Sequence, residues 1–549
     1  NWPPQICEVV NNSVVYANYS KQPLIGDKTT KFLCLPISTE SPVPNLSTPP
    51  PSKAVKSEPS YPLLILQNTN TSILSPIHMQ ALSRIHTTYS NVFNSDLSSG
   101  YNGKSGKFFA TLSFKSDQLP ESKQCPVPLY NHKCLALQQQ LMDSLEDQGV
   151  LVDPQKHNIN VKKVSPSFIL QKGRAKHKKL ETCSLDELRW VVAFNNLNDD
   201  LLPRPSKQTS GRNVLTFLAK YKFHIHADLF NSYFQIPVRR QDWEWLGIRT
   251  PFRGIRVLTR SGQGLLNSET ELDELISRVL GDEIFKGICY AERDDIIVGG
   301  NSIDETIKNW EIVLTKLDKN NLKVSPSKVK IFPKDIEVFG HRIVDNEVHP
   351  SPHIITSLGK SSIDELKTVK QVNSWKGLYK TLLSSLPGLA HVMDPFDKEA
   401  ANKDSKSLFT WTPELIAAFN KAMTHLGEVN KLTLPHPDEQ LILMPDGART
   451  PCGIGWALFV QRIVNGKTSL LPVQFYSAKL KPYMQKWLPC EIEGVAASMA
   501  INASSHWILS SNKPTYVTPD CKAVVQAVNR MRLGKLSRNP RLQAILISI

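Results

Sequence analysis

Hydrophobic and polar positions follow regular periods from about residue 76 onward. The segment CLALQQQLMDSLEDQGVLVDP has the period of an amphipathic helix ending at Gly149, and a short apolar strand follows it. VSPSFIL and RWVVAFNNLN predict strands on either side of the basic loop QKGRAKHKKLE. Strands mixed with helices in this way predict an α+β fold.

The pattern divides the chain into four segments. Residues 1–75 include STESPVPNLSTPPPSKAVKSEPSYP, whose Pro and Ser content predicts a flexible segment without a packed core. Residues 76–345 have the mixed pattern, and within residues 346–430 the stretch 360–425 is helical in pattern and lacks acidic clusters. A β-rich pattern restarts in residues 431–549 with LILMPDGARTPCGIGWALFV, which indicates a new domain.

Two adjacent carboxylates, Asp294 and Asp295, lie between apolar runs in FKGICYAERDDIIVGG. The runs predict two short strands, with the acidic pair at the turn between them. Unshielded carboxylates at the end of a buried hairpin repel each other, and a divalent cation relieves that repulsion. Asp199 and Asp200 in NNLNDDLLPRP lack this strand context and are interpreted as a solvated turn.

A third carboxylate, Asp228, lies in FHIHADLFNSYFQIPV, after an apolar-alternating stretch and before an aromatic one. Metal-dependent nucleotidyl transfer uses a few carboxylates on rigid strands to hold two Mg²⁺ ions about 3.5–4 Å apart. One ion activates the primer 3′-hydroxyl, and the other neutralises the triphosphate and the leaving pyrophosphate. Asp228, Asp294 and Asp295 are candidates for this chemistry.

The charge of the chain favours a polyanionic partner. Lys and Arg number 65 against 50 Asp and Glu, so the net charge is +15 and the pI about 9.2. For a chain of this size the usual polyanion is nucleic acid, although a membrane-surface protein or a ribosomal factor has a similar charge. No run of 18 apolar residues occurs, so no transmembrane span is predicted. The 9 cysteines are scattered without a Cys-x-x-Cys pair, which favours reduced thiols over disulfides or a zinc site.

Seven segments, taken in order, carry a family resemblance: VSPSFILQKG, RWVVAFNNLN, ADLFNSYFQIP, RSGQGLLNSE, RDDIIVGG, LKVSPSKVKIF and VFGHRI. From roughly Ile77 to the C-terminus the chain resembles the reverse transcriptase–RNase H region of gypsy-like LTR retrotransposon Pol polyproteins. The resemblance implies a right-hand polymerase, with fingers and palm in residues 76–345 and thumb and connection in residues 346–430. It also implies an RNase H-like α/β domain in residues 431–549. NWPPQICEVV at the start lacks Met and a signal pattern, and is interpreted as internal to a longer chain.

The resemblance implies roles for the polymerase residues. Asp228 and Asp294 would be the main metal ligands, and Asp295 would help to position them. Arg189 matches the fingers arginine that grips the incoming triphosphate, a role that suits its planar fork of donors. A surface strand arginine is the structural alternative.

Further residues match the nucleotide and template site. Tyr233 matches the steric gate that excludes a ribose 2′-hydroxyl, although a core aromatic would have the same sequence pattern. Gln263 and Gly264 match the pair that lines the nucleotide and template site. Four loop lysines are candidates for binding template phosphate or the triphosphate, or they form a solvated charge run: Lys172, Lys176, Lys178 and Lys179.

Glu292 and Arg293 depart from the family pattern, which has Tyr or another apolar residue and then a small or apolar one. Alternatively, Tyr290 and Ala291 start the motif and the charged pair is an insertion. One hypothesis is damage, in which Arg293 pairs with Asp294 or Asp295 and competes with Mg²⁺. The other is adaptation, in which Glu292 and Arg293 pair across the turn.

A second carboxylate set resembles the RNase H site. Asp446 in LILMPDGARTPCGIGWALF matches the first catalytic position, and Asp520 in YVTPDCKAVVQAV matches the third. In WLPCEIEGVAASMAI two glutamates compete, and the spacing to the apolar face favours Glu493 over Glu491. Such carboxylates would bind paired Mg²⁺ and activate water against an RNA phosphodiester.

This second set also departs from its family. Pro445 and Pro519 precede the two aspartates where the family commonly has Thr, and Pro is poorly placed inside a central strand. The chain stops at LISI, before the place where the family's fourth metal-binding residue would lie. We therefore expect a truncated nuclease domain of doubtful activity.

Taken together, these patterns predict an RNA-directed DNA polymerase that extends a DNA primer on an RNA or DNA template with dNTPs. The attached RNase H domain would cleave RNA in RNA–DNA hybrids, and Mg²⁺, or Mn²⁺ in its place, is the predicted cofactor. Such a protein is expected in cytoplasmic retrotransposon particles or in the nucleus. The alternative is a decayed or domesticated retroelement protein that binds nucleic acid without catalysis.

Overall fold

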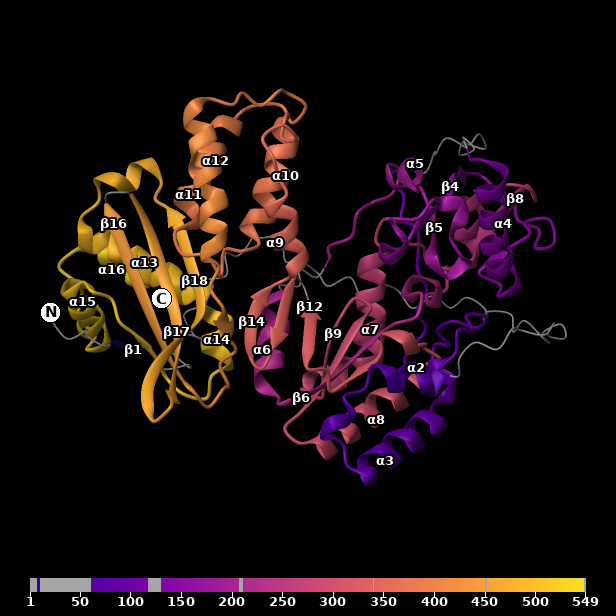
Figure 1. Cartoon of the computed structure of the whole chain (residues 1–549), viewed down its shortest axis with the longest axis horizontal. Coiled ribbons are helices and arrows are strands. Elements are labelled where there is room, and N and C mark those ends of the chain that lie inside the picture. Colours follow the sequence, from indigo (N-terminus) through magenta and orange to yellow (C-terminus); the bar gives the residue numbers. More distant parts are fainter. Residues whose placement is uncertain are drawn as a thin grey trace. The chain divides into compact units, whose positions relative to one another are not determined.

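The computed structural model describes residues 7–9, 61–116, 130–206, 211–338, 340–449 and 452–547. The chain divides into two compact units (Figure 1). The described part of the N-terminal unit comprises residues 61–116, 130–206 and 221–333, and that of the C-terminal unit comprises residues 7–9, 211–220, 334–338, 340–449 and 452–547. Each unit has its own sheets and its own buried core.

An antiparallel sheet of order β11-β6-β10-β9 forms the centre of the N-terminal unit. After Asp295, the other five residues of β10 are all buried, so this strand is covered on both faces. Apolar, β-branched residues such as Ile296 and Ile297 suit such a position. The strands are β6 (Phe223–Asp228), β9 (Cys289–Glu292), β10 (Asp295–Gly300) and β11 (Lys330–Ile331).

Helix α8 (Ile303–Lys319) packs against β10 and β6 of this sheet. It begins at Ser302, whose hydroxyl accepts a hydrogen bond from the backbone N–H of Glu305, as in a standard N-cap. The close approach requires glycine, because a Cβ on Gly300 would lie 2.5 Å from Thr306 of α8. The other helices of this layer are α2 (Tyr61–Gln67), α3 (Pro76–Thr88) and α7 (Ser268–Phe285).

The rest of the N-terminal unit consists of a second four-stranded sheet of order β2-β8-β7-β3 and a separate hairpin. The hairpin strands are β4 (Ser167–Gln171) and β5 (Leu188–Val192), which hold the basic loop between them. The remaining elements are α4 (His132–Asp147), α5 (Asn195–Asn198), β2 (Leu151–Val152), β3 (Val164–Ser165), β7 (Gly247–Arg249) and β8 (Ile255–Leu258).

The C-terminal unit begins with an antiparallel sheet of order β12-β13-β14-β15 and a group of helices with an aromatic core around Trp375. Trp375 contacts Tyr379, Phe396 and Phe419 edge to face or tilted, with ring centroids 5.2–5.6 Å apart. Its elements are β12 (Asp335–Val338), β13 (His341–Val344), β14 (Glu347–Pro350), β15 (Leu432–Thr433), α6 (Gly211–Lys220), α9 (Pro352–Gly359), α10 (Val369–Lys380), α11 (Leu389–Ala400) and α12 (Pro413–His425).

The same unit contains a five-stranded sheet of order β1-β19-β16-β17-β18, in which β19 is parallel to β16 and the other pairs are antiparallel. Helix α13 packs across β16 and β17. The elements are β1 (Cys7–Val9), β16 (Gln440–Arg449), β17 (Cys452–Val464), β18 (Lys467–Lys479), β19 (Thr515–Val517), α13 (Pro489–Ala503), α14 (Ser505–Ser510), α15 (Lys522–Arg532) and α16 (Pro540–Ile547).

The predicted helix before Gly149, the strands around the basic loop and the acidic hairpin are confirmed. The prediction of an unpacked segment is wrong for residues 61–75, because α2 lies there and its Ile65 is only 1% exposed in the core. Residues 1–6 and 10–60 of that predicted segment lie outside the described residues. Asp200 is not merely solvated, because it forms an ion pair with the buried Lys163.

Candidate functional sites

The three predicted polymerase carboxylates meet at one edge of the central sheet. Asp228 ends β6, Asp295 begins β10, and the two are direct partners in the antiparallel ladder. Their side chains therefore lie on the same face. Asp294 occupies the turn before β10, and its carbonyl accepts a hydrogen bond from the backbone N–H of Leu229 at 2.9 Å.

The hairpin that carries Asp294 is regular. Glu292 pairs with Asp295, so the turn consists of Arg293 and Asp294 alone, and the pairing continues without a bulge to Cys289 and Val298. Because the hairpin contains no unpaired extra residue, it favours the interpretation that Glu292 and Arg293 replace two residues of the family motif over the interpretation that they are inserted into it. Arg293 adopts a left-handed backbone with φ 58°, a conformation that costs a non-glycine residue about 1 kcal/mol or more.

Both unusual residues have partners that the sequence did not predict. Glu292 is only 6% exposed, and its carboxylate accepts a hydrogen bond of 2.7 Å from the hydroxyl of Tyr290. The Arg293 guanidinium lies 3.0 Å from the carboxylate of Glu269, in the first turn of α7. The expected pairing of Arg293 with Asp294 or Asp295, and its pairing with Glu292, are therefore both wrong, since the chain folds Arg293 toward α7 instead.

The electrostatics of the carboxylate group suit a cation. The ammonium group of Lys328 lies 2.7 Å from Asp228, yet burial still raises the pKa of Asp228 above its usual value. Burial, and then the neighbouring Asp294 and Asp228, raise the pKa of Asp295 to about 6. The site thus holds more negative charge than Lys328 neutralises, and a divalent cation would supply the missing positive charge.

The residues predicted to line the nucleotide site differ in their burial and in their partners. Tyr233 is half-buried, and its pKa is raised by burial and then by the carboxylates of Glu269 and Asp294, which places it beside the hairpin. Gln263 is exposed, and Gly264 has φ +85° and accepts a hydrogen bond of 2.8 Å from the amide of Asn198.

Arg189 is exposed on β5, and the basic loop that it flanks has mixed partners. The pKa of Lys172 is lowered by burial and also by the charges of Arg189 and Lys328, so these three cations lie near one another. Lys178 is engaged in an ion pair with Glu187. Lys176 and Lys179 are exposed, which leaves them accessible to a polyanion.

Sequence reasoning missed Lys328 and Glu269. Lys328 lies in LKVSPSKVKIF, one of the seven segments that carry the family resemblance, so the sequence could have marked it as a candidate site residue. Nothing in the sequence pattern indicated that its partner is Asp228. Glu269 is one of several acidic residues at the start of α7 and has no distinguishing pattern.

The predicted nuclease carboxylates come together in the C-terminal unit. Asp446 on β16, Glu493 on α13 and Asp520 after β19 present ligand atoms within 4.8 Å of one another. Within the described ranges, no other group of three such side chains is that close, so the polymerase carboxylates are more widely spread. Gly447 permits the approach of α13, because a Cβ there would lie 3.2 Å from the backbone nitrogen of Glu493.

Glu493 is the buried member of this trio, at 6% exposed. Burial, and then the charge of Asp520, raise its pKa to about 8. One carboxylate oxygen accepts a hydrogen bond of 3.2 Å from the backbone N–H of Gly447, while the other is buried with no hydrogen-bond partner. A buried orphan oxygen facing two further carboxylates fits a divalent cation.

Glu491 has a different environment. Its carboxylate accepts hydrogen bonds from the backbone N–H of Leu488 at 2.9 Å and from Arg541 at 3.0 Å, so it caps α13 and ties it to α16. The structure thus brings Glu493, not Glu491, to the carboxylate trio.

Pro445 and Pro519 do not interrupt the pairing of β16 with β19 in the five-stranded sheet. The backbone carbonyl of Leu443 accepts a hydrogen bond from the N–H of Thr518. Alternate residues of a strand direct their backbone groups to the same neighbouring strand, so every second residue of β16, counted from Leu443, is on the side of β19. Pro445 is the next such residue, and β19 has already ended there. Pro519 also lies beyond the last residue of β19, so both prolines end a ladder rather than break one.

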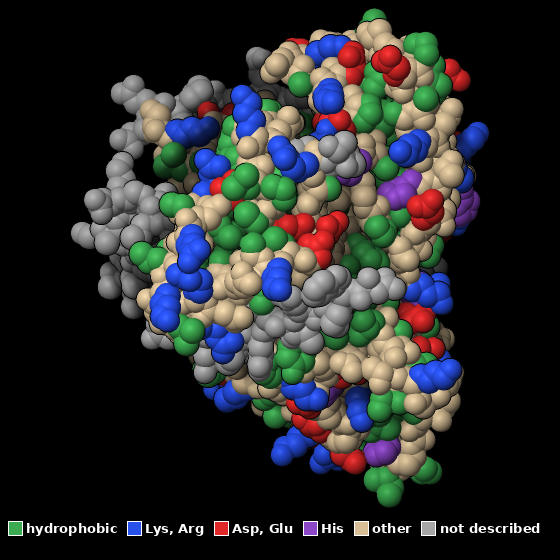
Figure 2. Space-filling view, turned by 90° about the vertical axis from the view of Figure 1, so that its left-hand side faces the viewer, with side chains coloured by type: hydrophobic (Ala, Val, Ile, Leu, Met, Phe, Trp, Pro, Cys, Tyr) green, Lys and Arg blue, Asp and Glu red, His purple; other side chains and the backbone are tan. Residues whose placement is uncertain are grey.

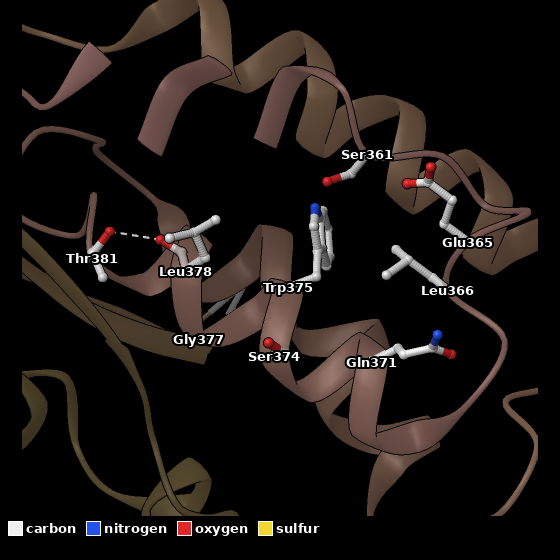
Figure 3. Close-up of a pocket in the computed structure, with 9 residues that line it drawn as sticks. All are labelled: Ser361, Glu365, Leu366, Gln371, Ser374, Trp375, Gly377, Leu378 and Thr381. Carbon is white, nitrogen blue, oxygen red and sulfur yellow. Dashed lines mark hydrogen bonds between the residues drawn. The ribbon is translucent and has the colours of Figure 1, made fainter. Parts of the chain in front are cut away.

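Figure 3 shows a pocket over α10 whose lining includes none of the carboxylates of the two candidate sites, and its volume is about 550 Å³. Apart from Glu365 its lining is neutral, and Thr381 donates a hydrogen bond of 2.6 Å to the backbone of Leu378 within it. It therefore lacks the charged groups that phosphate or metal chemistry requires.

Two family models match the chain. Residues 170–343 match the reverse transcriptase (RNA-dependent DNA polymerase) family, and residues 411–516 match the RNase H-like domain found in reverse transcriptase. The first range contains Asp228, Asp294 and Asp295, and the second contains Asp446 and Glu493. Reverse transcriptase families generally use divalent metals, which agrees with both carboxylate groups.

The relatives are Pol polyproteins. The chain is 23% identical to the polyprotein of transposon 297 from Drosophila melanogaster over 63% of this chain and 30% of that protein. It is 23% identical to that of transposon gypsy from the same organism, over 68% of this chain and 35% of that protein. It is also 23% identical to the Gag-Pol polyprotein of Walleye dermal sarcoma virus, over 80% of this chain and 24% of that protein. The chain thus spans about a third or less of the length of these relatives.

The fold is similar to solved foamy viral structures. The protease–reverse transcriptase dRH in complex with double-stranded DNA has a TM-score of 0.69 at 16% identity, covering 91% of this chain and 82% of that one. The protease–reverse transcriptase in complex with an RNA/DNA hybrid has a TM-score of 0.63 at 16% identity, covering 91% and 63%. The predicted polymerase fold followed by an RNase H-like domain is confirmed. The chain carries a domain of the reverse transcriptase family and then an RNase H-like domain, and it is related to the Pol polyproteins of retroviruses and retrotransposons.

Proposed function

We propose that the chain is the RNA-directed DNA polymerase of a gypsy-like LTR retrotransposon, extending a DNA primer on an RNA or DNA template with dNTPs. The observation that carries the proposal is the placement of three carboxylates together inside the matched reverse transcriptase range. Asp228 and Asp295 are partners at the ends of two paired strands, and Asp294 occupies the turn next to Asp295. The pKa values of Asp228 and Asp295 are raised, by burial first and then by the neighbouring carboxylates, as expected of negative charge that a cation would neutralise.

The residues divide the work as follows. Asp228 and Asp294 would hold Mg²⁺, or Mn²⁺ in its place, with Asp295 positioning them; the bound ions would neutralise the charge of the transferring phosphoryl group. Lys328 must leave Asp228 when a metal ion binds there. Arg189 would orient the triphosphate, and Tyr233 would exclude a ribose 2′-hydroxyl.

The C-terminal trio supports a second activity. Asp446, Glu493 and Asp520 are close enough to hold divalent ions, which would activate water against the RNA strand of an RNA–DNA hybrid. The foamy viral relatives bind double-stranded DNA and an RNA/DNA hybrid, which supports the same substrates here. No helix in the described part of the chain is long and apolar enough to cross a membrane, and we propose that the protein acts in retrotransposon particles in the cytoplasm or in the nucleus.

The competing function is a retroelement-derived protein that binds nucleic acid without catalysis. Incubation with poly(rA)·oligo(dT), labelled dTTP and Mg²⁺ or Mn²⁺ separates the two, provided that binding is measured in the same samples. Incorporation supports the polymerase. A bound but unextended primer at every metal concentration supports the binding protein.

Tyr233→Ala is expected to raise ribonucleotide incorporation relative to deoxyribonucleotide incorporation. The half-buried ring lies beside Asp294, so its removal opens space where the sugar of a metal-bound nucleotide would lie. Both substrates are measured on the same primer, and Tyr233→Phe, which keeps the ring, serves as the matched control. An unchanged ratio in the alanine variant would assign Tyr233 to the core.

The basic loop is expected to contribute to the salt dependence of binding. On the face that Figure 2 shows, Lys and Arg side chains are spread around a central group of Asp and Glu side chains. Because Lys178 is already paired with Glu187, the double variant Lys176→Gln/Lys179→Gln should account for most of the effect.

The expected change follows from counterion release. Each phosphate contact contributes about 0.9 to the slope of log affinity against log salt, so removing two contacts flattens the slope by about 1.8. Lys308→Gln/Lys319→Gln, on exposed positions of α8, is the control with the same loss of charge. Equal slopes for the two double variants would show that the loop is only solvated.

A further inference from the structure

The ion pair between Arg293 and Glu269 is placed where an unpaired arginine would be harmful to the proposed polymerase. Arg293 precedes Asp294 directly in a two-residue turn, and Asp295 follows. The site holds three carboxylates, and Lys328, which forms an ion pair with Asp228, lies far from the turn along the chain. A guanidinium is a strong bidentate partner for a carboxylate, so Arg293 would compete with a metal ion for Asp294 or Asp295.

Glu269 offers that arginine another partner. Its carboxylate lies 3.0 Å from the guanidinium, and both side chains are about half-exposed, at 52% for Arg293 and 59% for Glu269. An exposed pair contributes little to folding stability. The main effect of this ion pair is therefore the position in which it holds the Arg293 guanidinium, and not a contribution to the free energy of folding.

The surroundings of Tyr233 agree with this placement. Burial raises the pKa of Tyr233, and the charges of Glu269, Asp294 and Arg293 also act on it. The ion pair and the acidic turn are therefore both in the neighbourhood of this half-buried side chain. The pair lies at the proposed nucleotide site and not on a remote surface.

We propose that Glu269 is a positioning residue that holds Arg293 away from Asp294 and Asp295 and so keeps these carboxylates free to bind divalent metal. The inference rests on the proposed polymerase function. It also explains how a chain with Arg at the acidic turn retains a usable site, because the compensating charge lies on α7 rather than on the hairpin.

The test is a rescue experiment on the full chain. Asp446→Asn/Asp520→Asn serves as the background, so that the nuclease carboxylates do not contribute to metal binding. Glu269→Gln should raise the half-saturating Mg²⁺ concentration for primer extension about fivefold, because the released Arg293 turns to the carboxylates. Arg293→Gln alone should not raise it. The double variant Glu269→Gln/Arg293→Gln should return to the value of Arg293→Gln.

A second measurement does not depend on catalysis. Binding of Mn²⁺ to the same four proteins, followed by the electron paramagnetic resonance signal of the free ion, should show the same order of affinities. Glu274→Gln is the matched control, since Glu274 pairs with Arg278 at 2.6 Å on the same helix, and it should leave both measurements unchanged.

The outcomes separate the two proposals. A Glu269→Gln variant with normal metal affinity would overturn the inference, and so would a loss of affinity that Arg293→Gln does not rescue, because Glu269 would then act through the fold or as a ligand. Absence of extension in every protein, including the background variant, would refute the polymerase proposal. The Mn²⁺ measurement would still decide the role of Glu269 in that case.

Discussion

Asp294→Asn is expected to reduce primer extension by more than a hundredfold, and Asp228→Asn by a similar factor. Asp228 ends a paired strand and Asp294 occupies a two-residue turn between paired strands, so the backbone holds both in place. Loss of one ligand charge removes about 3 kcal/mol or more of transition-state stabilisation from phosphoryl transfer, which corresponds to a factor of more than a hundred in rate. The quantity to measure is single-turnover incorporation at saturating Mg²⁺.

The loss should be specific to chemistry. Asn has nearly the same shape as Asp and relieves repulsion among the carboxylates, so the midpoint of urea unfolding should stay close to that of the wild type. Asp199→Asn is the matched control, because Asp199 is an exposed aspartate that also precedes another aspartate in the same unit. Extension by Asp294→Asn at more than a tenth of the wild-type rate would contradict its assignment as a metal ligand.

Glu493→Gln is expected to reduce cleavage of the RNA strand in an RNA–DNA hybrid by more than a hundredfold while leaving primer extension unchanged. The physical reason is again the loss of a charged ligand, here from a trio whose ligand atoms lie within 4.8 Å of one another. Hybrid labelled on the RNA strand reports cleavage directly. Normal cleavage by this variant would remove Glu493 from the site.

Stability gives an independent check on Glu493. Its pKa in the folded state, about 8, lies above the ordinary 4.5, so its contribution to stability is fully present below pH 4.5 and is lost as pH rises through 8. In the presence of EDTA, Glu493→Gln should therefore flatten the fall in stability between pH 5 and 8. Glu491→Gln should lower stability, since it loses the charged pair with Arg541, and should leave RNA cleavage unchanged, since the carboxylate trio is kept.

Much of the candidate chemistry could be predicted because it lies within short segments. The acidic turn is flanked by apolar strands, and the nuclease carboxylates each stand at a strand or helix whose pattern is visible along the chain. Register then follows from the turn, since a two-residue hairpin fixes the partner of Asp295 as Glu292. The preference for Glu493 over Glu491 came from the apolar face of one helix.

The partners that tune the polymerase site could not be predicted, because they come from elements distant in sequence. Glu269 reaches Arg293 only through the packing of α7 beside β9, and Lys328 reaches Asp228 through the approach of β11 to β6. The packed helix α2 was missed because it lies next to a Pro-rich stretch, although its Ile65 is a core residue. Ion pairs have no sequence period, so only the tertiary structure shows which charges meet.

Reverse transcription of an RNA of mixed sequence is the most direct test of the central claim. The wild-type chain is incubated with this template, a DNA primer, all four dNTPs and Mg²⁺, and the products are sequenced. We expect the wild-type chain to extend the primer by many nucleotides of DNA complementary to the template. This product should be absent when EDTA is added and absent with Asp294→Asn. A primer that the protein binds at the same concentration but does not extend would contradict the proposed polymerase activity.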